Sequence, residues 1–203
     1  METNKEKINE DRQICRATIS TTTGEGYDFE AVAVPSVNGQ LRYSYENNEV
    51  FNQILRTSPE NIDTSRLDSG IPLFDNHPYD NSAVNTLGIT TSYLFDERGL
   101  VVRAKFGARA DEALRTDVKN GVIKTVSIEG TIINYSVQRD GNKIPQYFAD
   151  LWTPESLSFA PVPNDIAAQI EIKRALKEQK DKSEVNPQNG DTILNNIINK
   201  YKK

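Results

Sequence analysis

The sequence has one cysteine, one histidine and no long apolar run, and each shortage removes a class of function. Because Cys15 is the only cysteine, an internal disulfide is excluded, as are most cysteine-based metal sites. A zinc site would have to be built from carboxylates, so we expect no metal and no cofactor. No segment approaches the roughly 18 apolar residues of a membrane span, and residues 1–7 lack the apolar stretch of a signal peptide. We therefore expect a cytoplasmic protein without a membrane partner.

Positive charge is also in short supply. The chain has 24 Lys and Arg residues against 29 Asp and Glu residues, for a formal net charge of -5. Binding to phosphate backbones requires a concentrated basic surface, so we expect no nucleic-acid partner.

The 203 residues suffice for one domain of ordinary size together with tails. Residues 1–14 are mostly charged or polar and predict a disordered N-terminal arm. Residues 15–172 carry the apolar patterning of a folded domain. Residues 173–203 predict a charged linker that ends in a short amphipathic helix from Thr192 to Tyr201, which needs a partner surface for stability.

The middle of the chain predicts mainly strands. Strands are expected at 16–21, 27–34, 71–74 and 122–137, and a hairpin at 85–95 and 99–106. A helix is expected from Ala110 to Asn120, because apolar residues recur on one face and Gly121 follows as a left-handed cap. Residues 63–70 predict a polar loop or short helical turn, 140–142 a turn, and 146–149 the start of an apolar stretch. The type of 41–55 stays open because its pattern has no clean period.

Chemistry, if present, is expected at Ser127 and His77. Ser127 lies in a β-branched run, and serine becomes a useful nucleophile only with a base within hydrogen-bond reach. His77 is the only histidine and follows a short apolar run. Glycine is absent two residues before Ser127, so the strand-turn-helix elbow of the α/β-hydrolases is excluded.

Several ordered stretches together resemble the tailed-phage prohead (capsid-maturation) serine protease family. They span roughly residues 15 to 170, and their combination is more specific than any single one. They are Ser65-Arg66-Leu67, Pro72 to His77, Gly99 to Phe106, Asp117 to Gly121, Val126-Ser127-Ile128-Glu129-Gly130, Trp152-Thr153-Pro154 and Leu157 to Pro163.

The resemblance implies an α+β, mainly β fold: an antiparallel β-barrel of the herpesvirus-assemblin type with a few surrounding helices, here over residues 15–172. It implies a serine endopeptidase that cleaves scaffold and capsid-protein extensions, and possibly itself, inside the procapsid in the host cytoplasm. Ser127 would be the nucleophile and His77 the general base. The implied partners are the major capsid protein, the scaffold protein and a second copy of the chain.

The third catalytic residue departs from the family pattern. Phage relatives commonly carry Glu two residues before the serine equivalent to Ser158, and here that place is Ser156, with Glu155 one step away. We assign Glu155, which requires a bulge because a shift of one residue along a strand reverses the side chain. The alternatives are Glu129, Asp75 and Asp150, each expected to be solvated, or no acid at all.

Two other functions stay open. The displaced acid is compatible with a catalytically inactive, scaffold-like virion component that keeps the protease fold. A β-rich binding module with helical tails is favoured if the runs Ile71 to His77 and Val122 to Gly130 are not neighbouring strands.

Overall fold

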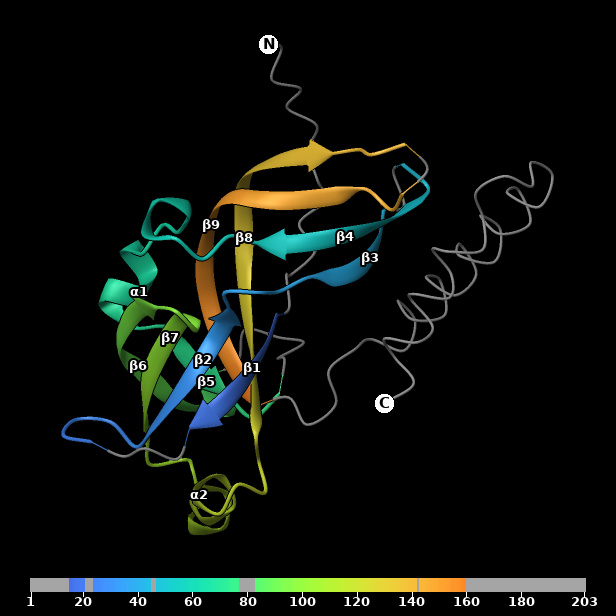
Figure 1. Ribbon diagram of the computed structural model, residues 1–203. Coiled ribbons are helices and arrows are strands. Elements are labelled where there is room, and N and C mark those ends of the chain that lie inside the picture. Colours follow the sequence, from blue (N-terminus) through green and yellow to red (C-terminus); the bar gives the residue numbers. More distant parts are fainter. Residues whose placement is uncertain (1–14, 21–23, 45–46, 77–82, 142, 160–203) are drawn as a thin grey trace. The chain divides into compact units, whose positions relative to one another are not determined.

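The protein consists mainly of strands with few helices, as the sequence predicts (Figure 1). The computed structural model describes residues 15–20, 24–44, 47–76, 83–141 and 143–159. His77, the predicted N-terminal arm and the predicted C-terminal linker and helix lie outside the described residues. The described chain divides into two compact units.

Among the described residues, the larger unit contains 15–20, 24–38, 55–76, 83–135 and 149–159. Its strands follow the order β9-β5-β6-β7-β2-β1-β8, and β8 also pairs with β9. The pairs β1–β2, β2–β7, β6–β7, β5–β6 and β1–β8 are antiparallel, whereas β5 and β9 are parallel. The strand bounds are β1 Cys15–Ser20, β2 Phe29–Pro35, β5 Pro72–Phe74, β6 Thr86–Asp96, β7 Gly99–Phe106, β8 Thr125–Gln138 and β9 Gln146–Phe159.

Aromatic side chains from three strands meet in the core of this unit. The ring of Phe29 lies 5.4 Å from that of Phe106 and 5.7 Å from that of Phe159. Trp152 is almost fully buried, and its indole nitrogen donates to the backbone oxygen of Arg56 at 2.9 Å. Burying a side chain of this size stabilises the fold by about 1.5–3 kcal/mol relative to leaving it exposed.

The predicted hairpin is confirmed as β6 and β7, which lie side by side in Figure 1. Its turn ends at Gly99, whose φ of 120° is disfavoured for residues with a side chain. Arg98 in the same turn donates to Glu30 of β2 at 2.9 Å, and Arg103 donates to the other oxygen of Glu30 at 3.0 Å. Burial raises the pKa of the Glu30 carboxyl, but the hydrogen bonds from Arg98 and Arg103 outweigh it and leave that pKa below its usual value.

The helices are short. The predicted helical turn at 63–70 is α1, Ser65–Ser69, which lies beside β6 in Figure 1. The predicted helix at 110–120 is α2, Glu112–Lys119. It begins later than predicted because Asp111 is extended and its side chain accepts a hydrogen bond from the Leu114 nitrogen, as an N-cap does. Gly121 has a φ of 68°, which confirms the predicted left-handed ending.

The smaller unit resolves the region whose type the sequence left open. Residues 41–55 contribute two antiparallel strands, β3 Gln40–Ser44 and β4 Glu49–Leu55. The Glu49 carboxylate accepts from both Arg139 and Tyr147, and the Tyr147 ring lies 4.4 Å from that of Phe51. The Arg139 hydrogen bonds outweigh burial and lower the pKa of Glu49. Long-range contacts therefore stabilise this unit.

Candidate active site

Ser127 lies on a strand of the larger unit that is paired on both of its sides. It belongs to β8, its register partner on β1 is Arg16, and the other side of β8 pairs with β9. Its side chain is fully buried, and its Oγ atom has no hydrogen-bond partner among the described residues. A buried hydroxyl left unpaired costs about 1–3 kcal/mol, and no described residue offsets that cost at Ser127.

Three more buried polar side chains share this face of β8 and β9. Ser127 and Glu129 are alternate residues of β8, and Ser156 and Ser158 are alternate residues of β9, so each pair projects to one side. The Ser156 hydroxyl donates to Oε2 of Glu129 at 3.0 Å, which shows that the two faces coincide. We call these four residues the serine–glutamate cluster. Ser158 Oγ, like Ser127 Oγ, is buried and has no partner among the described residues.

Gly130 brings the two strands close beside the cluster. A Cβ atom at Gly130 would lie 2.3 Å from the backbone oxygen of Thr153 in β9. Any side chain there would separate the strands. The glycine after Glu129 thus allows Ser156 to reach the carboxylate.

Strand β5 ends beside the cluster. Its last residue, Phe74, is the register partner of Ser158, and Leu73 is the partner of Leu157. His77 follows three residues later, outside the described residues, so its pairing with Ser127 stays a prediction. Within the described residues, β5 and β8 are not neighbouring strands, because β9 lies between them.

Glu155 points away from the cluster. It makes an ion pair with Arg66 of α1 at 3.4 Å, and about a third of its side chain (34%) is exposed. Its neighbour Ser156 contacts Glu129, so the two consecutive side chains of β9 project to opposite faces. The structure therefore places Glu155 on the face opposite to Ser127 and does not bring the two predicted site residues together.

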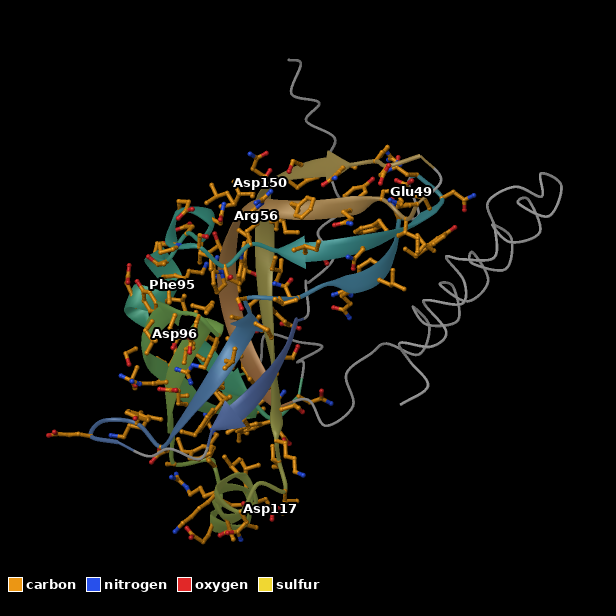
Figure 2. All side chains as sticks on the ribbon, viewed as in Figure 1. Glu49, Arg56, Phe95, Asp96, Asp117 and Asp150 are labelled. Carbon is orange, nitrogen blue, oxygen red and sulfur yellow. The ribbon has the colours of Figure 1, made fainter. Side chains whose placement is uncertain are left out.

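The other predicted acids differ in their surroundings. Asp75 is exposed. Asp150 accepts a hydrogen bond from Arg56 at 2.8 Å, and Figure 2 shows the two side by side. Glu129 is only 5% exposed, so its expected solvated role is wrong. The reason is that Gly130 and the β8–β9 pairing bury this position.

Another carboxylate lies on the Glu155 side of β9. Asp63 accepts from the Thr153 hydroxyl at 3.0 Å and from the Ser65 backbone nitrogen at 3.1 Å. The hydrogen bond from Ser65 contributes most to lowering the pKa of Asp63, with Thr153 adding to it. This group secures the start of α1 to β9.

The contact between Ser156 and Glu129 was missed from the sequence, although a signal was present. Polar residues recur at a spacing of two in both strands, which places each pair on one face of a strand. Because the sequence did not predict that these two strands are neighbours, it did not predict a contact between their polar residues.

Within the described part of the chain, no group of three or more His, Cys, Asp or Glu side chains is placed to hold a metal ion. The helices described here are all too short or too polar to cross a membrane. No family model matches the chain, and comparison with curated proteins and with solved structures finds no match either.

Proposed function

We propose that the protein is a serine endopeptidase of phage capsid maturation, with Ser127 as nucleophile and His77 as general base. The observation that supports it is the buried hydroxyl of Ser127 in the serine–glutamate cluster, which has no hydrogen-bond partner among the described residues. A buried hydroxyl without a partner lowers the free energy of unfolding, and natural proteins commonly keep such destabilising groups at functional sites. The ordered sequence resemblance supplies the reaction class.

The reaction follows from the chemistry of serine. The Ser127 oxygen forms a bond to the scissile carbonyl carbon while His77 takes the hydroxyl proton. The carbon–nitrogen bond then breaks, and the proton passes to the leaving amine. Water adds to the resulting ester in the same way, which releases the acid product and restores the serine.

The finer fold and the partners belong to this proposal. An antiparallel β-barrel of the prohead-protease type is the finer fold that belongs to this proposal, and the antiparallel pairing of β8, β1, β2, β7 and β6 supports it. The substrates are the scaffold and major capsid proteins inside the procapsid, in the host cytoplasm. A second copy of the chain is a further proposed partner.

The test compares the full chain with Ser127→Ala and His77→Ala variants. Each is incubated with the scaffold and capsid proteins, and the products and the chain's own termini are identified by mass spectrometry. Ser92→Ala is the matched control, because Ser92 is an exposed strand serine in β6. We expect cleavage by the wild type and the control only. Equal cleavage by all forms, or cleavage by none, contradicts the proposal.

A catalytically inactive virion component is the second candidate. Two observations favour it: Ser127 is fully buried, and β9 lies between the strand of Ser127 and the strand that leads to His77. The separation of β5 from β8 also favours a binding module. Stable co-purification with capsid or scaffold protein, without cleavage by the wild type, would establish the inactive component. Failure of both cleavage and capsid binding would leave the binding module.

A further inference from the structure

A buried carboxylate lies two residues from Ser127, on the same face of β8. Glu129 is 5% exposed, and the Ser156 hydroxyl donates to it at 3.0 Å. Removing a carboxylate from water is costly, so a protein that needed only packing here would gain by replacing it. We infer that Glu129 is the acidic positioning residue of the site and that Ser156 holds its carboxylate. This inference rests on the proposed function.

The spacing along β8 suits this role. Residues two apart on one face leave the strand about 6.5–7 Å from each other. A base between a serine hydroxyl and a carboxylate makes one hydrogen bond of about 2.8 Å to each, with its ring between them, and spans a similar distance. A carboxylate so placed fixes the orientation of the base and stabilises its protonated form.

Glu155 is the competing assignment, and the contacts argue against it. It projects from the opposite face of β9, and its carboxylate is ion-paired with Arg66. Acting on Ser127 would require breaking this pair and reversing a strand residue. Glu129 already projects from the same face of β8 as Ser127.

The experiment measures the reactivity of Ser127 in the full chain with diisopropyl fluorophosphate. In this reaction the serine oxygen bonds to phosphorus, the phosphorus–fluorine bond breaks, fluoride leaves, and the hydroxyl proton passes to the base. The rate is followed against pH, and the labelled residue is identified by mass spectrometry. No knowledge of the natural substrate is needed.

Removing the charge should slow labelling without unfolding the protein. We expect Glu129→Gln to lower the rate roughly 10³- to 10⁴-fold, as when the acid of a serine–base–acid site is neutralised. The midpoint of the pH profile should fall by roughly 1–3 pH units, because a neighbouring carboxylate raises the pKa of a base. Glu112→Gln, on the exposed face of α2, is the matched control and should leave both values unchanged.

Exchanging Glu129 and Ser156 tests whether a carboxylate held by a serine across the strand pair is what the reaction requires. The double variant Glu129→Ser, Ser156→Glu keeps the same two side chains across the strand pair. It should label at least tenfold faster than Glu129→Gln, whereas a purely structural role predicts no recovery. Thermal unfolding of each variant identifies any that fails to fold, and the double variant then decides.

The outcomes separate the two proposals. A wild type that is not labelled at Ser127 overturns the proposed function, and this inference with it. A wild type labelled at Ser127 whose rate and midpoint are unchanged in Glu129→Gln overturns the inference alone. Slower labelling in Glu155→Gln together with an unchanged Glu129→Gln variant would assign the acid to Glu155.

Discussion

Replacing Ser127 by alanine should make the protein more stable. The change removes a fully buried hydroxyl that has no partner among the described residues. Leaving such a group unpaired costs about 1–3 kcal/mol. The vacated space is only that of one oxygen atom, and its lost packing offsets part of the gain. We expect a net increase of about 1 kcal/mol in the free energy of unfolding, or about 2–4 °C in melting temperature for a chain of this size.

Ser156→Ala is the matched control, because the same atoms are removed from the same face of the sheet. The Ser156 hydroxyl donates to the buried Glu129 carboxylate, so its loss should lower the free energy of unfolding by about 1–3 kcal/mol. Urea unfolding monitored by tryptophan fluorescence measures both, since Trp152 is buried in the same unit. Destabilisation of both variants by similar amounts would refute the reasoning, because it would mean that the Ser127 hydroxyl has a partner outside the described residues, the position of the proposed base His77.

Two further predictions concern charge and backbone. The pKa of Glu30 is lowered in the folded state, so the stability it contributes is present above pH about 4.5 and is lost as the pH falls through the folded value. Glu30→Gln should therefore make the free energy of unfolding fall less steeply as the pH is lowered. An unchanged fall would show that Arg98 and Arg103 do not hold this carboxylate. Gly99→Ala should cost about 3 kcal/mol or more in urea unfolding, because its Cβ would lie 2.1 Å from the Val34 backbone oxygen at a φ of 120°. Gly121→Ala, in open space at a φ of 68°, should cost only about 1 kcal/mol, and equal losses would contradict this account.

Local signals made most of the fold predictable. The hairpin of β6 and β7 was predicted from two patterned runs around one turn, and α2 from apolar residues on one face before Gly121. The type of β3 and β4 was not predictable, since what secures them is distant in sequence. Phe51 packs on Tyr147, and Glu49 binds Arg139.

The candidate site was predictable only in part, for a similar reason. Ser127 was singled out by its own run, but the contact between Glu129 and Ser156 depends on how β8 aligns with β9. Shifting that alignment by one residue would turn every side chain of one strand to the other face. The sequence predicted a turn at 140–142 but no strand after it, so this alignment was not predicted. Gly130 can be read from the sequence, but the sequence does not show that the backbones of β8 and β9 approach each other there.

The position of β8 also sets when the site is completed during synthesis. This strand lies between β1, the first strand of the described chain, and β9, the last. Pairings between such distant segments form slowly, and a nascent chain cannot make them before its final strand has emerged. We expect Ser127 to reach its buried position only after nearly all of the described chain has been translated. A truncated product that ends before β9 would lack Ser156 and Ser158, so it should not form the serine–glutamate cluster.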